Sequence, residues 1–147
     1  MIEYTVEIGD GSKEWYLNGK LHREDGPAAN SNGYKAWYIN DELHREDGPA
    51  IEYDDGYKAW YINGKRHRED GPAVDDSNGY KAWYLNNKRH REDGPAVEFT
   101  NGDKEWCLDD KRYSEEEYNI KMNPVKEYSI EQLHVILGHE FKIKAKE

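Results

Sequence analysis

The tetrapeptide His-Arg-Glu-Asp places an imidazole, a guanidinium and two carboxylates in consecutive positions of this chain. Imidazole and carboxylate groups are common general acids and bases of enzymes, so this combination could move protons or hold a charged ligand. The tetrapeptide runs on into Gly-Pro-Ala, and the resulting segment occurs four times, at residues 22–28, 44–50, 67–73 and 90–96. Catalysis requires one preorganised constellation in a cleft. Four identical copies therefore argue against an enzyme, and the sequence predicts no catalytic residue.

A fixed period runs through most of the chain. The four segments start 22 or 23 residues apart, and tryptophans keep the same spacing: Trp15, Trp37, Trp60, Trp83 and Trp106. Repetition at this period is typical of small supersecondary units that bury their apolar faces only by stacking on their neighbours. The sequence therefore predicts a hairpin-repeat array of about five units over residues 1–112. Residues 113–147 are predicted to form a C-terminal cap.

The four segments, called return segments below, are expected to have a structural role. Their arginines can pair with acidic residues of adjacent units, and their histidines can stack or hydrogen-bond along the array. Exposed ion pairs contribute only about 0–1 kcal/mol each, whereas a network contributes more. The residues assigned to this structural ladder are His22, Arg23, His44, Arg45, His67, Arg68, His90 and Arg91.

One unit can be followed from residue 50 onward. Residues 50–53 have strand character, residues 54–56 suit a turn, and residues 58–62 suit a second strand. Asn63-Gly64 then predicts a two-residue type I′ turn, which favours a tight hairpin. Each unit is thus predicted to be an antiparallel hairpin followed by a polar return, and the fold is predicted to be mainly β.

The two sides of the second strand carry different aromatic residues. Trp60 shares its side with Ile62, and the other units pair their tryptophan with isoleucine or leucine, so the five tryptophans are predicted to form the core ladder. The opposite side carries a tyrosine row: Tyr16, Tyr38, Tyr61 and Tyr84. This row either packs as a second face or forms an exposed strip that contacts a partner, since exposed aromatic residues are good interface anchors.

The period ends at Tyr113, which stands where a histidine is expected. Ser114 and Glu117 have the spacing of a capping box and predict the start of a helix. A second helix is predicted after Ser129, followed by a strand over residues 141–145 in which apolar residues alternate with lysines. This small α/β piece is expected to cover the last hairpin, because an array must shield its open edge.

The chain is acidic, with 31 acidic and 21 basic residues and a net charge of −10. Residues 1–112 alone carry 24 acidic and 16 basic residues. Such a surface repels long nucleic acids and favours a protein partner that has a basic surface.

The remaining composition argues against metals, cofactors and membranes. The single cysteine, Cys107, takes the place of a tyrosine in the tyrosine row and is expected to pack; it also fits a reducing compartment. No residue spacing matches a closed zinc site, and no cofactor is predicted. No apolar run approaches the roughly 20 residues of a membrane helix, and residues 1–4 lack the pattern of a signal peptide. A cytoplasmic protein is therefore expected.

Residues 60–67, Trp-Tyr-Ile-Asn-Gly-Lys-Arg-His, recur with the period of the array and resemble a MORN-type repeat. The resemblance extends roughly over residues 3–112. It departs from that family at Arg23, Arg45, Arg68 and Arg91, where MORN units usually have glycine, and in the Asp-Gly-Pro-Ala tail. The variant is similar to repeat proteins of bacteriophages and large DNA viruses. The resemblance implies stacked antiparallel hairpins in an elongated, twisted sheet and a scaffold or protein-binding role.

These observations predict a non-enzymatic protein-interaction module. The viral resemblance implies an acidic inhibitor of a host defence or nucleic-acid-handling protein, acting in the cytoplasm of a bacterial host. Two alternatives stay open. Tryptophan, tyrosine and arginine side chains could together bind a small nucleotide or signalling ligand, although no glycine-rich phosphate loop is present. The ends of the array could also pair with other copies and build a self-associating scaffold.

Overall fold

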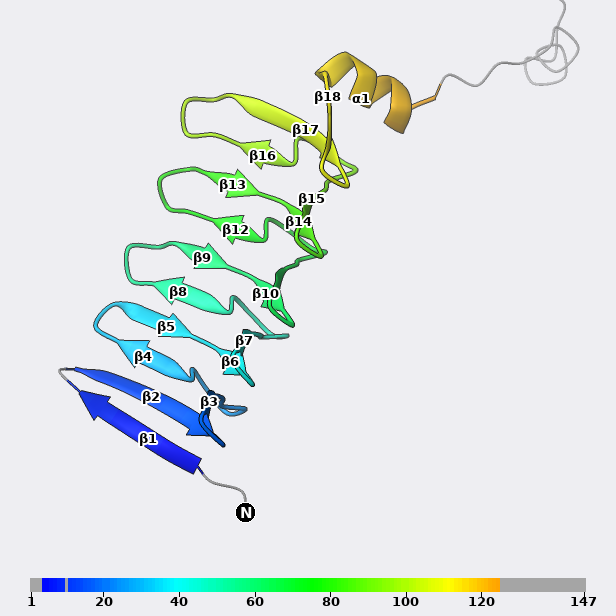
Figure 1. The fold of residues 1–147 in the computed structure, drawn as a ribbon. Helices are drawn as coiled ribbons and strands as arrows, with labels where there is room; N and C mark the ends of the chain where they lie inside the picture. Colours follow the sequence, from blue (N-terminus) through cyan, green and yellow to red (C-terminus); the bar gives the residue numbers. More distant parts are fainter. Residues whose placement is uncertain (1–3, 10, 125–147) are drawn as a thin grey trace, which may run out of the picture.

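The computed structural model describes residues 4–9 and 11–124. These residues form one long, open antiparallel sheet of hairpin-linked strands, followed by a single short helix (Figure 1). The mainly β fold predicted from the sequence is therefore confirmed. The second helix predicted after Ser129 and the strand predicted over residues 141–145 lie outside the described residues.

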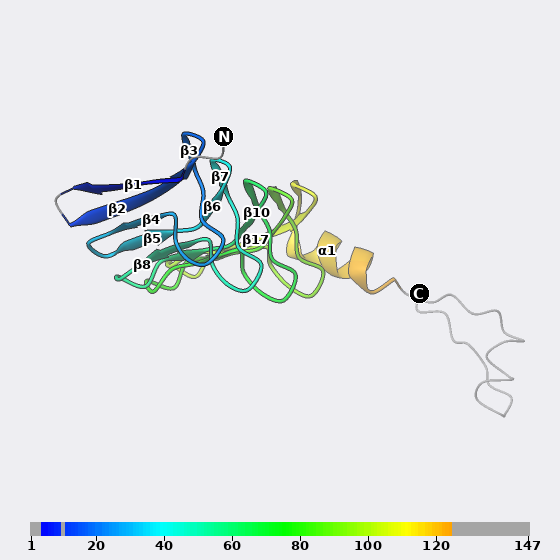
Figure 2. The ribbon, with the colours of Figure 1, turned by 90° about the horizontal axis from the view of Figure 1, so that it is seen from below.

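The main sheet has 12 strands, and its hydrogen-bonded order follows the chain. Its strands are β1 (Tyr4–Gly9), β2 (Ser12–Leu17), β4 (Ala29–Ser31), β5 (Tyr34–Ala36), β8 (Ile51–Tyr53), β9 (Lys58–Ala59), β12 (Val74–Asp75), β13 (Lys81–Ala82), β16 (Val97–Glu98), β17 (Lys104–Leu108) and β18 (Lys111–Tyr113), with β3 (Lys20–Leu21) paired to β2. Short two-stranded sheets extend the middle units: β6 (Tyr38–Ile39) with β7 (Glu42–Leu43), β10 (Tyr61–Ile62) with β11 (Lys65–Arg66), and β14 (Tyr84–Leu85) with β15 (Lys88–Arg89). Figure 2 shows that β3, β7 and β10 turn away from the main strands.

Successive hairpins join by the same antiparallel pairing that holds each hairpin together. β8 pairs with β9 so that Ile51 lies opposite Ala59, and β9 pairs with β12 so that Val74 lies opposite the same alanine. Because directly opposite residues share a face of the sheet, Ala59 has an apolar neighbour on each side, and its side chain is fully buried. Each hairpin therefore extends one continuous sheet and covers the edge of the previous hairpin.

The predicted strand over residues 58–62 is interrupted at Trp60. The Trp60 N–H donates to the carbonyl of Ala73 at 2.8 Å, and the Trp60 carbonyl accepts from the His67 N–H at 3.2 Å. Both partners belong to the return segment at residues 67–73, and Trp37 and Trp83 make the same pair of bonds with their own return segments. The return segment is thus hydrogen-bonded to the strand that precedes it, which separates β9 from β10.

The fully buried positions are held mainly by small residues. Alanines with no exposed surface recur along the sheet: Ala28, Ala36, Ala50, Ala59, Ala73, Ala82 and Ala96. The five tryptophans, which the sequence predicts as the core ladder, are half-buried instead. Among the described residues no second sheet covers the indoles, and the hydrogen bonds between each return segment and its strand bring the two backbones together where the alanines lie. The core therefore lies beside the tryptophans.

The hairpin turns have the geometry that the sequence predicts. Asn63 has a φ of 48° and Gly64 has a φ of 69°, both in the left-handed region that a type I′ turn requires. The equivalent turns at Asn18-Gly19, Asn40-Asp41, Asn86-Asn87 and Asp109-Asp110 also have positive φ at both positions.

The helix α1 (Glu115–Met122) starts with the predicted capping box. The Ser114 hydroxyl accepts from the Glu117 N–H at 3.1 Å, and the Glu117 carboxylate accepts from the Ser114 N–H at 2.8 Å. The helix contacts β17 and β18 at the end of the sheet.

Candidate functional site

The arginine of each return segment lies over the tryptophan of the same unit. The guanidinium carbon of Arg68 is 4.0 Å from the ring centroid of Trp60. The corresponding distances at Trp15, Trp37 and Trp83 are 4.2, 4.0 and 3.9 Å. A cation over an indole contributes about 0.5–1 kcal/mol at an exposed site and about 2 kcal/mol or more when water is excluded. This contact explains why tryptophan and arginine recur together eight residues apart.

Two further bonds fix the arginine in this position. The Arg68 Nε donates to Asp70 Oδ1 at 2.8 Å, and Arg68 Nη1 donates to the Pro72 carbonyl at 3.3 Å. The prediction placed these ion pairs between units, but all four arginines pair with the aspartate of their own return segment at 2.7–2.8 Å. Arg45 and Arg91 additionally pair with Glu52 and Glu98 in the first strand of the next unit, so the predicted pairing between units is present at these two arginines. The pairing is mostly local because the segment folds back over its own tryptophan.

The glycine of the return segment is needed for this close packing. A methyl group added at Gly71 would lie 3.0 Å from the guanidinium carbon of Arg68, and the same distance is 2.9–3.0 Å at Gly26, Gly48 and Gly94. Carbon atoms in ordinary contact are about 3.5–4.0 Å apart. Any larger residue would therefore push the guanidinium away from its tryptophan.

The histidines hydrogen-bond along the array, as predicted. The Asn63 N–H, in the turn of the next unit, donates to Nδ1 of His44 at 3.2 Å. The Nδ1 atoms of His22 and His67 lie in the same way 3.3 Å from the backbone nitrogens of Asn40 and Asn86. At His90 the nearer partner of Nδ1 is the Asp109 carboxylate at 3.1 Å, which can only accept, so Nδ1 of this ring donates. The Nε2 atoms lie 3.5–3.8 Å from the glutamates of the return segments.

The carboxylates of the return segments form an exposed acidic row. Its members are Glu24, Asp25, Glu46, Asp47, Glu69, Asp70, Glu92 and Asp93, whose side chains are 72–86% exposed. The hydrogen bond and charge of the neighbouring arginine hold the pKa of each aspartate below its usual value. The glutamates make no hydrogen bond with the described residues. The aspartate charge is therefore balanced within the fold, and the glutamate charge faces solvent.

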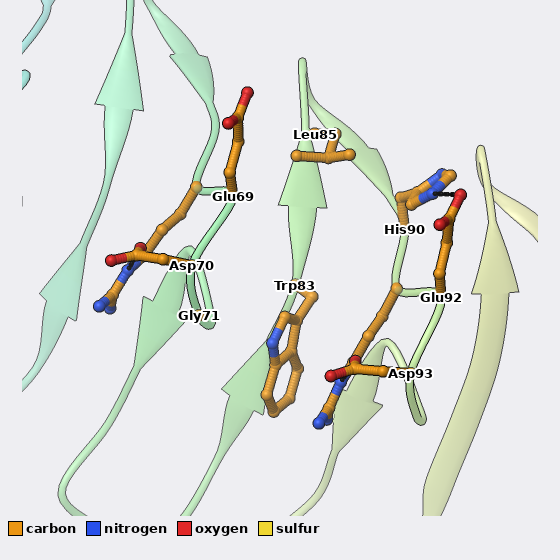
Figure 3. A pocket seen from close by; sticks show the side chains of 10 residues that line it. Glu69, Asp70, Gly71, Trp83, Leu85, His90, Glu92 and Asp93 are labelled. Atoms are coloured by element: carbon orange, nitrogen blue, oxygen red, sulfur yellow. Dashed lines mark hydrogen bonds and ion pairs between the residues drawn. The ribbon is translucent and has the colours of Figure 1, made fainter.

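Neighbouring return segments enclose a groove between them (Figure 3). In the groove of about 660 Å³, Glu69 and Asp70 form one side and Glu92 and Asp93 form the other, with Trp83 between them. Leu85, His90 and the arginines Arg68 and Arg91, whose charges are paired with Asp70 and Asp93, also line this groove. Grooves of about 710 and 690 Å³ are built in the same way around Trp37 and Trp60. Each groove thus offers an apolar side chain flanked by carboxylates, which suits the stem and head of a lysine or arginine.

The tyrosine row is half-buried, and its tyrosines in the middle of the sheet take part in packing. Tyr61 and Tyr84 pack against the buried Ala59, Val74, Ala82 and Val97. The guanidinium of Arg66 lies between these two tyrosines, and its Nε donates to the Tyr61 hydroxyl at 3.1 Å. At the first unit, the Tyr16 hydroxyl donates to Glu14 at 2.6 Å, and this bond raises the pKa of Tyr16 to about 12. The contacts therefore favour the packed role over an exposed strip.

The sequence analysis did not predict a role for a second set of repeated tyrosines. Tyr34, Tyr57 and Tyr80 are half-buried beside the hairpin loops, and burial raises the pKa of each. Tyr34 packs on Tyr53 with ring centroids 4.9 Å apart, and Tyr80 packs on Phe99 at 5.9 Å. The signal was present in the sequence, because these three tyrosines are also spaced 23 residues apart.

At the last unit a tyrosine replaces the arginine. Ser114 stands where the period expects the fifth arginine, and it caps helix α1 instead. The ring of Tyr118, only 2% exposed, packs on Trp106 with centroids 4.9 Å apart. Its hydroxyl donates to the Arg91 carbonyl at 2.7 Å and accepts from the Gly94 N–H at 3.2 Å. The helix therefore covers the final tryptophan and ties the last return segment to the end of the sheet.

The described part of the chain gives little support for a reactive thiol, a metal site or a membrane-spanning helix. Cys107 is free and fully buried, and burial raises the pKa of its thiol, which disfavours the reactive thiolate. Residues 4–9 and 11–124 contain no group of three or more histidine, cysteine, aspartate or glutamate side chains placed to hold a metal ion. Within these residues, no helix has the length and apolar character needed to cross a membrane.

Comparisons of the chain with protein-family models, with curated protein sequences and with solved structures found no match.

Proposed function

We propose that this protein is a non-enzymatic binding module whose acidic row engages a basic surface of a protein partner. The observation that carries the proposal is the glutamate of each return segment. The other members of the segment are partly or fully buried or are hydrogen-bonded in the fold. Glu24, Glu46, Glu69 and Glu92 are instead 72–86% exposed, make no hydrogen bond in the described structure, and approach only Nε2 of their own histidine, at 3.5–3.8 Å. A carboxylate that is repeated four times at a highly exposed position, with only this one contact, supports a role in binding.

The spacing of the grooves suggests what such a partner presents. Successive units are two strands apart, and neighbouring strands lie about 4.8 Å apart, so equivalent grooves recur about every 9–10 Å. A polyproline-type segment advances about 3.1 Å per residue, so every third residue returns after about 9.3 Å. An extended segment with lysine or arginine at every third position would therefore place one cation in each groove, with its stem against the tryptophan and leucine or isoleucine.

The resemblance to bacteriophage repeats makes an inhibitor of a bacterial host protein the working form of this proposal. A partner that handles nucleic acid has a basic surface, and an acidic row can occupy that surface in place of phosphates. Binding that depends on exposed charges should weaken steeply as salt is added.

The test is calorimetry with a synthetic proline-rich peptide that carries lysine at every third position. The fourfold variant Glu24→Gln, Glu46→Gln, Glu69→Gln, Glu92→Gln should bind at least about fourfold more weakly, since four exposed ion pairs contribute about 0.2–1 kcal/mol each. The matched control removes four exposed carboxylates outside the row: Glu42→Gln, Asp54→Asn, Glu115→Gln and Glu116→Gln.

The control variant should keep the affinity of the unmodified protein, and a peptide with the same lysines clustered at one end should bind more weakly. Equal losses in the two fourfold variants would mean that net charge alone is responsible, and the proposal would fail.

A further inference from the structure

The first strand of the sheet has an open edge. β1 is joined to β2 along one side, and no strand of the described residues pairs with its other side (Figure 1). All six residues of β1 are exposed, and Tyr4, Val6 and Ile8 are 72%, 50% and 74% exposed. Residues two apart along a strand share a face, so these three apolar side chains form one strip.

The edge lacks the features that usually prevent strand pairing. β1 and β2 are the longest strands described, at six residues each. β1 contains no proline and no lysine, and Glu7 is its only charged residue. Open edges that are long, apolar and sparsely charged are sites where a further strand adds.

We propose that β1 pairs with β1 of a second copy of this chain, antiparallel and around a two-fold axis at Val6. In this register Val6 lies opposite Val6 of the second copy, Tyr4 lies opposite Ile8, and Thr5 lies opposite Glu7. The two apolar strips then lie on the same face and form one continuous seam. Like charges are not opposed anywhere in this register.

The second copy is preferred as the occupant because the edge is complementary to itself. The seam also continues the apolar surface of the first hairpin, since Val6 and Tyr4 lie opposite Trp15 and Leu17 in the β1–β2 pair. Antiparallel pairing is already the way in which successive hairpins join. A two-fold arrangement uses both edges at once and closes, so it gives a dimer rather than a filament.

This dimer and the binding of a basic partner have opposite salt dependences. Each chain has a net charge of −10, so the two copies repel each other, and added salt should strengthen the dimer by screening that repulsion. Binding of a basic segment to the acidic row should weaken under the same conditions. The two proposals can therefore fail separately.

The experiment is sedimentation equilibrium of the full chain from about 1 µM to 1 mM at low and high salt. The unmodified protein should show a monomer–dimer equilibrium that shifts toward the dimer as salt rises. Val6→Lys should weaken the dimer at least tenfold, because directly opposite side chains are only about 4.5–5.5 Å apart and the two ammonium groups would repel. Ile8→Lys, at a more exposed site, should weaken it as well.

Thr5→Lys is the matched control, with the same charge change on the same strand. Its lysine faces Glu7 of the second copy, so the dimer should be kept or tightened. Near-UV circular dichroism of the tryptophans checks that each variant is folded. A monomer at all concentrations, a dimer that Val6→Lys leaves intact, or species that keep growing with concentration would each overturn the proposal.

Discussion

At its C-terminal end the sheet is covered by helix α1, whereas at its N-terminal end none of residues 4–9 and 11–124 covers the outer edge of the first strand. The final tryptophan, Trp106, is covered by Tyr118 of α1, which is 2% exposed. Tyr4 of β1, by contrast, is 72% exposed. In the middle of the sheet each hairpin covers its predecessor, so both ends face the same problem. The two ends therefore differ in how the terminal hairpin is treated. The last hairpin is covered by the added helix α1, whereas the first hairpin keeps a strand edge that is unpaired within the described residues and to which a further strand could add.

The largest expected effect tests the covered end. Tyr118→Ala removes the ring from Trp106 and both hydroxyl hydrogen bonds, and it should lower the free energy of unfolding by about 3–5 kcal/mol, as other buried aromatic truncations do. Tyr4→Ala at the bare end should change the stability of the monomer by no more than about 0.5 kcal/mol. Urea unfolding followed by tryptophan fluorescence measures both values.

Ile120→Ala controls for general effects on the helix, since its side chain is 63% exposed on the same element. It should be nearly neutral. If Tyr118→Ala cost no more than Ile120→Ala or Tyr4→Ala, the helix would not be a cover, and the contrast between the two ends would disappear.

A smaller loss of stability is expected when the same glycine-to-alanine substitution is made in the return segment nearest each end. Gly94→Ala and Gly26→Ala each place a methyl group 2.9–3.0 Å from a guanidinium carbon and should cost about 1–3 kcal/mol by overpacking. Gly94→Ala should lie at the upper end of this range, because the Gly94 N–H also donates to the Tyr118 hydroxyl. Thermal unfolding compares the two variants.

A double-mutant cycle tests the cause of this cost. In an Arg91→Ala background the methyl group at Gly94 meets no guanidinium, so most of the penalty of Gly94→Ala should vanish. If Gly94→Ala still lowered the stability by the same amount in this background, the cost would come from the backbone and not from the contact with Arg91.

Much of the fold could be predicted from the sequence because local rules agree with the period. Asn63-Gly64 determines its turn through the backbone preferences of those two residues, and Ser114 with Glu117 determines the helix start through hydrogen bonds three residues apart. Both features depend only on neighbours along the chain, and both predictions are confirmed.

The arrangement of the return segments was less predictable, because spacing along the chain does not say which face is covered. The period marks Trp60 and Arg68 as repeated residues, but their stacking follows from the fold of the return segment between them. The same limitation applies to the core. Ala59 and Ala73 recur as regularly as the tryptophans, yet only the backbone approach of strand and return segment shows that these methyl groups fill the interior.

Inside the sheet, Gly64 and Asn87 occupy the same position in two neighbouring turns, so the residue of each turn can be substituted into the other. Asn87 uses its side-chain oxygen to accept from the Arg66 N–H of the previous unit at 2.7 Å, whereas Gly64 has no side chain to do this. Asn87→Gly should therefore cost about 1 kcal/mol. Gly64→Asn should be neutral or stabilising by a similar amount, because asparagine tolerates a φ of 69° and the added Cβ has only ordinary contacts. Chemical denaturation of both variants checks the signs, and destabilisation by both would contradict the account.

The smallest expected effect is the loss of stability at low pH, and we expect it at the C-terminal end, where Glu117 caps helix α1. Hydrogen bonds from the backbone and side chain of Ser114 hold the pKa of Glu117 below its ordinary value of 4.5. A carboxylate with a lowered pKa in the folded state stabilises that state above its ordinary pKa, and this stabilisation is lost as the pH falls through the folded value. The end covered by α1 should therefore loosen below about pH 4.5. Glu117→Gln keeps a capping-box side chain that does not titrate, so the unfolding midpoint of this variant should fall less between pH 6 and pH 3. If the unfolding midpoints of the two proteins changed identically with pH, protonation of Glu117 would not be the cause of the lost stability at low pH.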